Sequence, residues 1–74
     1  MAQFAIKSEI AGSVLSIEVN EGQKVDESAE IVLVEAMKME IPVTTTKAGV
    51  ITSIRVAVGA PIAEGDVVAM VEVS

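Results

Sequence analysis

Residues 12–36, GSVLSIEVNEGQKVDESAEIVLVEA, return with changes as residues 49–73, GVITSIRVAVGAPIAEGDVVAMVEV. A shift of 37 residues aligns the two stretches without a gap. The alignment keeps glycines, apolar residues and glutamates in register, with identities or conservative exchanges at Gly12/Gly49, Val14/Ile51, Ser16/Ser53, Ile17/Ile54, Val19/Val56, Gly22/Gly59, Val25/Ile62, Glu27/Glu64, Val34/Val71 and Glu35/Glu72. An ordered set of matches at one spacing indicates that a structural unit is duplicated.

Both repeats have the pattern of short β-strands separated by turns. Apolar residues spaced at the period of a strand predict strands over residues 14–19 and 51–58. Near-continuous apolar runs at residues 31–35 and 67–73 predict strands that are buried on both faces or enclosed in a sandwich. Helical periodicity is weak throughout, so the sequence indicates an all-β domain.

Glycine and proline mark the ends of these strands. Gly22 and Gly59 follow the first strand of each repeat, where glycine accepts a positive φ without a Cβ clash. Pro61 is expected in a turn or at the start of a strand, and Pro42 at a sheet edge or at a strand start, because proline cannot donate a ladder hydrogen bond. Two β-rich halves of equal length predict two small antiparallel sheets related by a pseudo-twofold axis.

The composition excludes several classes of function. The chain has 74 residues, which suits a single domain over residues 1–74, and 51% of them are apolar, with Phe4 as the only aromatic. A formal net charge of −6 and the lack of tryptophan and tyrosine argue against binding to nucleic acid. Without cysteine or histidine the chain lacks the usual zinc ligands and the usual general base, so we expect no metal site and no independent catalysis.

The sequence also contains no targeting or membrane signal. No apolar run approaches the roughly 20 residues that a membrane helix needs. The first residues do not form the basic and then apolar pattern of a secretory signal. We therefore expect no membrane association and a cytoplasmic location.

The hexapeptide Glu35-Ala36-Met37-Lys38-Met39-Glu40 places one lysine between two thioethers and two carboxylates. The shift of 37 sets Lys38 opposite residue 1, so the counterpart of its hairpin is the gap between the two chain ends. In a pseudo-twofold scaffold, Lys38 is then expected to project from the end remote from both termini. A simpler interpretation is also open, in which Met37 and Met39 fill the core and Lys38 extends outward.

This hexapeptide closely resembles the biotinylation motif of biotin carboxyl carrier domains, in the biotinyl/lipoyl-attachment family. The resemblance runs from about Ile6 to Val73 and includes the turn glycines. It departs at Ser28-Ala29, where the family usually has a Gly-Asp-like pair, and at residues 8–12, where the family often has an Ala-Pro-Met-Pro-Gly-like segment. Neither 37-residue half has room for the protruding thumb of some bacterial carriers, so the chain is similar to thumbless members.

The resemblance implies a fold, a cofactor and a set of site residues. The fold would be a flattened barrel or sandwich of two four-stranded antiparallel sheets with pseudo-twofold symmetry, and Lys38 would lie on a hairpin turn opposite the termini. Biotin would be the cofactor, covalently attached to Lys38. The residues around the lysine would form the recognition motif, namely Glu35, Ala36, Met37, Met39 and Glu40.

The same resemblance implies a carrier function. A biotin protein ligase would biotinylate Lys38, and the domain would then carry carboxyl groups between a biotin carboxylase and a carboxyltransferase, as in acyl-CoA carboxylase. The chain would be a non-catalytic component, because the cofactor and the partner enzymes supply the chemistry. Two alternatives are a lipoyl carrier of a 2-oxo acid dehydrogenase-type complex, where the lysine usually has an Asp-Lys-Ala-like context, and an unmodified structural or adaptor module of the same fold.

Overall fold

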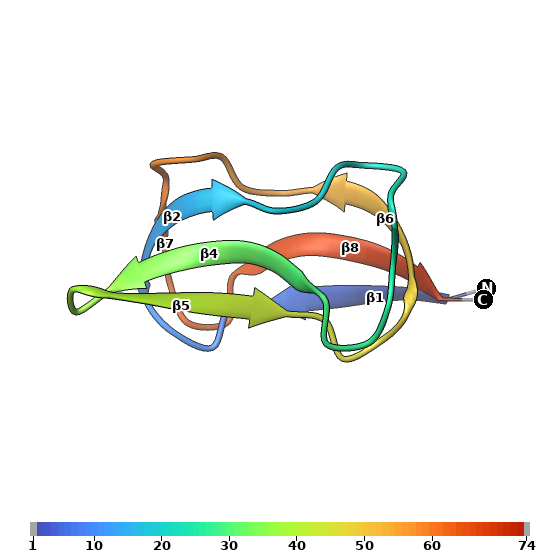
Figure 1. Cartoon of the computed structure of the whole chain (residues 1–74), viewed down its shortest axis with the longest axis horizontal. Helices are drawn as coiled ribbons and strands as arrows, with labels where there is room; N and C mark the ends of the chain where they lie inside the picture. The colour runs from blue at the N-terminus through green and yellow to red at the C-terminus, as the bar shows by residue number, and fades with distance from the viewer. Residues whose placement is uncertain (1, 74) are drawn as a thin grey trace.

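The computed structural model describes residues 2–73, which form eight β-strands in two antiparallel sheets (Figure 1). The strands are β1 (Ala2–Lys7), β2 (Gly12–Ile17), β3 (Lys24–Val25), β4 (Glu30–Ala36), β5 (Met39–Thr44), β6 (Gly49–Ile54), β7 (Pro61–Ile62) and β8 (Val67–Val73). One sheet has the order β1-β8-β6-β3 and the other the order β5-β4-β2-β7. Each sheet keeps two edge strands, so the pair is a sandwich that does not close into a barrel. The expected all-β fold with two four-stranded antiparallel sheets is confirmed.

The two halves of the chain build the two sheets together. Each strand from β5 to β8 begins and ends 37 residues after its counterpart from β1 to β4, and the same shift converts one sheet order into the other. The pairing register follows, since Val34 lies opposite Ile41 in one sheet and Val71 lies opposite Phe4 in the other. Each sheet draws two strands from each half, so neither half can complete a sheet without the other.

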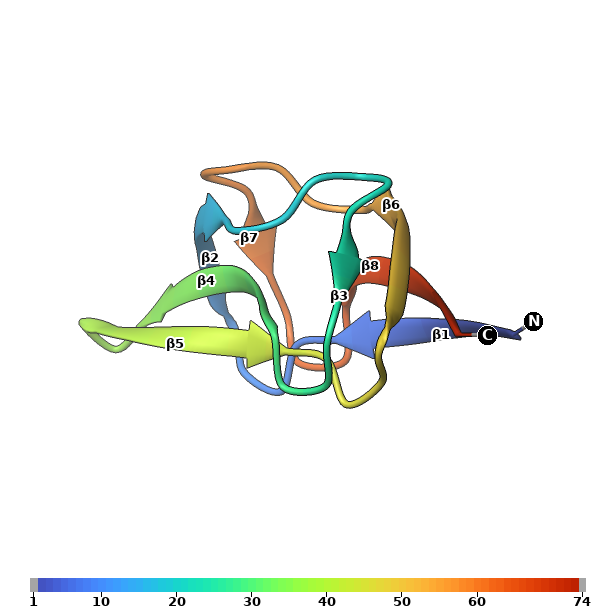
Figure 2. The same cartoon turned by 45° about the vertical axis from the view of Figure 1, so that its right-hand side comes forward.

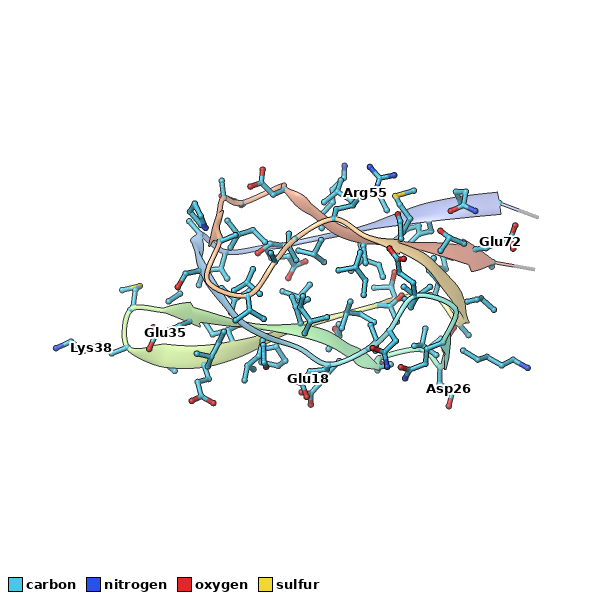
Figure 3. The ribbon with its side chains drawn as sticks, turned by 90° about the horizontal axis from the view of Figure 1, so that it is seen from above. Glu18, Asp26, Glu35, Lys38, Arg55 and Glu72 are labelled. Atoms are coloured by element: carbon cyan, nitrogen blue, oxygen red, sulfur yellow. The ribbon has the colours of Figure 1, made fainter. Side chains whose placement is uncertain are left out.

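The core lies between the two sheets and receives at least one buried apolar side chain from every strand. The view from above shows these side chains filling the space between the layers (Figure 3). β4 and β8 contribute the most buried residues, and each is paired on both sides within its sheet. Their near-continuous apolar sequences are therefore explained by their place as interior strands enclosed in the sandwich.

Two of the predicted strands are shorter in the structure than the apolar spacing indicated. β6 ends at Ile54 instead of residue 58, and β2 likewise ends two residues before its predicted end. After Ile54, the amide of Arg55 donates a 2.8 Å hydrogen bond to the carbonyl of Val68, and the chain then turns toward β7. Val56 is half-buried against the core, whereas Val58 is 64% exposed. The apolar spacing beyond Ile54 thus reflects the contact of Val56 with the core and not a continuation of the strand.

The prolines and the turn glycines lie where the sequence predicted them. Pro61 is the first residue of β7, and Pro42 lies within β5, which is an edge strand. Gly22 and Gly59 lie in the turns after β2 and β6, each with a φ of 88°. The two proline positions need no donor for a ladder hydrogen bond, and the two glycine positions have a positive φ that is favourable without a Cβ atom.

Two buried polar residues, Ser8 and Thr45, lie 37 residues apart and have the same structural role. Each hydroxyl donates to the carbonyl two residues later, at 2.6 Å for Ser8 and 2.8 Å for Thr45, and accepts a hydrogen bond from the amide of that same residue. The Ser8 backbone pairs with Gly65 and Asp66, while the Thr45 backbone pairs with Ser28 and Ala29. Each hydroxyl therefore satisfies the backbone of a loop that connects the two sheets, between β1 and β2 for Ser8 and between β5 and β6 for Thr45. Neither role is visible in the sequence, because a hydroxyl side chain contributes nothing to the apolar pattern.

A stability prediction follows from Ser28, which has a φ of 69° where its counterpart 37 residues later is Gly65, with a φ of 90°. A side chain in the left-handed region destabilises the folded state by about 1–2 kcal/mol. Glycine removes that cost, but it loses more backbone entropy on folding, which lowers the free energy of unfolding by roughly 0.5–1 kcal/mol. We expect Ser28→Gly to raise the free energy of unfolding by roughly 0.5–1 kcal/mol, measured by urea denaturation. Ser13, within β2, is the control, and Ser13→Gly should lower the free energy of unfolding. A loss of stability in both variants would contradict the strain at Ser28.

Candidate modification site

The hexapeptide of residues 35–40 forms the tip of the hairpin between β4 and β5 (Figure 1). Ala36 lies opposite Met39 at the end of the ladder, which leaves Met37 and Lys38 as a two-residue turn. The φ angles of Met37 and Lys38 are 52° and 64°. A two-residue loop with positive φ at both positions has the backbone of a type I′ turn, whose twist matches that of the strands it connects.

Neither Met37 nor Lys38 is a residue that this backbone favours. Type I′ turns prefer Asn-Gly or Asp-Gly, because both central residues must be left-handed. Any other side chain there costs about 1–2 kcal/mol per residue. Strain of this kind is retained where a particular side chain is needed for function. We therefore infer that Met37 and Lys38 are retained for their side chains, although other residues would suit this backbone conformation better.

The side chains of the turn extend into solvent. Lys38 is exposed and points away from both sheets at the tip of the hairpin (Figure 3). Met37 is 90% exposed and Met39 is 63% exposed, so the interpretation of the two methionines as core filler is wrong. Ala36 is the buried residue of the hexapeptide, with 5% exposure, and it anchors the tip to the sandwich.

Two carboxylates flank the turn at a cost to the hairpin. Glu35 and Glu40 are both exposed and lie directly opposite each other on β4 and β5. Like charges in such a cross-strand pair are destabilising. The corresponding pair in the other sheet is Glu72 and Gln3, which carries a single charge. The hairpin thus concentrates negative charge beside Lys38 although the fold does not require it.

Lys38 lies at the end of the molecule opposite the start of β1 and the end of β8. Figures 1 and 2 show the hairpin between β4 and β5 at one end and the start of β1 with the end of β8 at the other, and Figure 3 shows Lys38 and Glu35 at the end opposite Glu72. The molecule measures 37 × 19 × 18 Å, so the hairpin and these strand ends are separated along its longest axis. The predicted placement of Lys38 on a hairpin turn opposite the termini is confirmed within the described residues, whose first and last members are Ala2 of β1 and Val73 of β8.

Gly12, at the start of β2, supports the base of the hairpin. A Cβ atom on Gly12 would collide with the backbone carbonyl oxygen of Glu35, and Gly49 has the same relation to Glu72. Glycine therefore lets β2 approach β4 two residues before the turn. The sequence marked Gly12 only as a matched position of the repeat, since a close approach of two backbones is decided by tertiary packing.

The hexapeptide thus offers one exposed primary amine on a turn of defined shape, which is a suitable acceptor for an enzyme-catalysed acylation.

A hollow of about 800 Å³ lies between the edge strands β1 and β5, and Lys38 does not line it. Among residues 2–73, no group of three or more His, Cys, Asp or Glu side chains is placed to hold a metal ion. The same residues include no helix of the length and hydrophobicity that a membrane span requires.

The sequence profile of the family described as biotin-requiring enzyme matches residues 5–71. The chain belongs to this family. The domain is 41% identical over 66 residues to the biotinylated protein TB7.3 homolog of Mycobacterium leprae, covering 89% of this chain and 93% of that protein. It is also 41% identical over 68 residues to the biotin-dependent acyl-coenzyme A carboxylase alpha3 subunit of Mycobacterium leprae, covering 92% of this chain and 11% of that subunit. Among solved structures, the urea carboxylase of Kluyveromyces lactis matches with a TM-score of 0.92 and 28% identity, over 97% of this chain and 6% of the enzyme.

The chain is therefore a biotinyl domain, and biotin is the cofactor of its family, as the hexapeptide predicted. The domain spans nearly the whole of a small biotinylated protein but only about a tenth of the matched carboxylase subunit. Its relatives thus include both a short protein of similar length and long carboxylases of which it resembles one part.

The strained turn generates a stability prediction for the biotinyl domain. Lys38→Gly and Lys38→Ala remove the same charge and stem, but only glycine relieves the left-handed backbone at φ 64°. We expect the free energy of unfolding of the glycine variant to be roughly 0.5–1 kcal/mol higher than that of the alanine variant. Lys24 is the matched control, because it is exposed within β3, and there the glycine variant should be the less stable one. Urea denaturation of the four variants measures both differences, and the same sign at both positions would contradict a strained turn.

Proposed function

We propose that Lys38 is the biotin attachment residue and that the domain carries carboxyl groups between a biotin carboxylase and a carboxyltransferase. The observation that supports this proposal best is the place of Lys38, in a left-handed two-residue turn at the end opposite the start of β1 and the end of β8. Exposure alone does not select it, since Lys7, Lys24 and Lys47 are exposed as well. Those three lysines have no positive φ, and none of them lies at the tip of a hairpin.

Lys38 provides the nucleophile for attachment. A biotin protein ligase presents the carboxyl group of biotin as its adenylate, and the neutral amine of Lys38 attacks the carboxyl carbon. The bond to the phosphate of AMP breaks, the nitrogen loses a proton, and an amide is formed. Because the ladder between β4 and β5 extends up to the pair Ala36 and Met39, it holds the two-residue turn in one conformation, and the ligase meets the same geometry at every encounter.

The residues around Lys38 form the surface that partner enzymes recognise. Met37 and Met39 present exposed apolar side chains on either side of the amine. Glu35 and Glu40 add a negative field that suits a basic surface on a partner. Ala36 contributes from the interior, where its small buried side chain fixes the tip of the hairpin to the core.

The scaffold keeps the attached group accessible. Biotin, once bound, supplies the group that takes up and releases CO₂, and the lysine side chain provides a flexible stem. Tethering at the opposite end would leave the hairpin uncovered and would hold the cofactor at a high local concentration near both partner active sites. In this proposal residues 1–74 act as one biotinyl domain, a non-catalytic component of a cytoplasmic biotin-dependent carboxylase.

Co-expression with a biotin protein ligase tests the attachment residue. We expect the intact mass of the chain to rise by one biotinyl group and the formal net charge to change from −6 to −7, because acylation removes one cation. Lys38→Arg preserves the charge but should abolish labelling, since a guanidinium does not replace the amine. Mass spectrometry measures the adduct, and a native gel measures the change in charge.

Lys47→Arg is the matched control, because Lys47 is also exposed but lies in the loop between β5 and β6. This variant should be labelled as well as the unaltered chain. An adduct on Lys38→Arg would move the attachment to another lysine. Labelling by a lipoyl ligase and not by the biotin ligase would favour the lipoyl carrier, and no labelling by either would favour the unmodified adaptor.

A further inference from the structure

The two thioethers beside Lys38 are more accessible than the other methionine that the structure describes. Met37 is 90% exposed and Met39 is 63% exposed, whereas Met70 is half-buried on β8. Met70 is also held between neighbours, since it lies opposite Ala5 of β1 and Ser53 of β6. An oxidant dissolved in water therefore reaches the thioethers of the turn before it reaches Met70.

The fold itself does not require thioethers at the turn. The residue that corresponds to Met39 in the other half is Ala2, at the start of β1, which is exposed as well. Met37 corresponds in sequence to Ser74. Small residues thus occupy both equivalent positions in a chain that otherwise repeats its architecture closely. The methionine side chains add apolar surface around Lys38 that the sandwich does not bury.

We expect an enzyme that encloses the amine of Lys38 to contact these side chains, because Met37 precedes it within the turn and Met39 follows it at the start of β5. Oxidation to the sulfoxide turns a flexible apolar side chain into a polar one. Burying that polar group against an apolar partner surface is unfavourable unless a hydrogen bond is formed. Since neither thioether lies in the core, the modification changes the surface that a partner meets and leaves the sandwich intact.

We propose that Met37 and Met39 form an oxidation switch, in which their sulfoxides make the hairpin a poor substrate for the enzymes that act at Lys38. Hydrogen peroxide is the oxidant: its O–O bond breaks, one oxygen atom bonds to the thioether sulfur, the sulfur loses two electrons, and water leaves. Methionine sulfoxide reductases reverse the reaction. This inference rests on the proposed attachment of biotin to Lys38, and it adds a regulatory modification to that site.

The test compares biotinylation before and after treatment with hydrogen peroxide, which is removed with catalase before ligase is added. We expect peptide mass spectrometry to find oxygen on Met37 and Met39 before Met70, and circular dichroism to show an unchanged fold. The kcat/KM of biotin protein ligase for the oxidised domain should fall at least about tenfold, equivalent to about 1.4 kcal/mol. Treatment with methionine sulfoxide reductases should restore the original value.

The double variant Met37→Leu/Met39→Leu is the principal control, because leucine preserves the apolar volume but cannot be oxidised. Its ratio of treated to untreated kcat/KM should be near one, whatever its untreated value. Met70→Leu is the second control and should remain as sensitive as the unaltered chain. Equal slowing of the unaltered chain and the double variant would overturn the switch, as would unchanged labelling of the oxidised chain.

The outcomes also separate this inference from the proposed function. If the untreated chain is biotinylated at Lys38 and the oxidised chain is biotinylated at the same rate, the attachment proposal holds and the switch is overturned. If the untreated chain is not biotinylated, both are overturned. Oxidation of Met70 ahead of the two turn methionines would also contradict the accessibility on which the switch depends.

Discussion

The pairing of β4 with β5 in one sheet and of β8 with β1 in the other is the constraint on which the rest of the molecule depends. Because these two ladders are equivalent under a shift of 37 residues, the turn that joins β4 to β5 corresponds to the place where the chain begins and ends. The turn is thereby placed at one end of the longest axis of the molecule, and the start of β1 and the end of β8 are placed at the other. A carrier domain needs this separation, because one end can be held while the other remains accessible.

The hairpin tip combines features that each reduce stability. Met37 and Lys38 occupy left-handed positions, Glu35 faces Glu40, and two large apolar side chains remain in solvent. The equivalent positions of the other half carry Ala2 and the pair Gln3 and Glu72, which avoid the second carboxylate and the exposed thioether. The two halves share one architecture, so this difference between them is not imposed by the sandwich. The core, to which every strand contributes, provides the stability that compensates for these unfavourable features of the tip.

Membership of the biotin-requiring enzyme family places these features in a functional context. Exposed methionines, a strained turn and opposed carboxylates are unexplained as parts of a stable sandwich, but each is accessible to an enzyme that approaches the hairpin along the long axis. The buried residues of the site have the complementary role. Ala36 fixes the tip from inside, and Gly12 lets β2 approach the β4 backbone at Glu35, so the amine is presented on a supported turn and not on a mobile loop.

The spacing of 37 residues, the apolar runs and the turn residues were sufficient to predict a duplicated all-β domain with two antiparallel sheets, because these patterns are present in the sequence itself. Four strands in each sheet were expected only from the resemblance to the biotinyl/lipoyl-attachment family, and the apolar patterns did not give the bounds of the edge strands β1, β3, β5 and β7. The position of Lys38 at the remote end also followed from the repeat. Tertiary structure decided which apolar residues are covered: Val56 packs against the core outside any strand, Val58 is exposed, and Met37 and Met39 are solvent-facing. It also decided the left-handed turn and the contact of Gly12 with Glu35. Periodicity reports that a side chain is apolar, but only the packing of the two sheets determines whether another surface covers it.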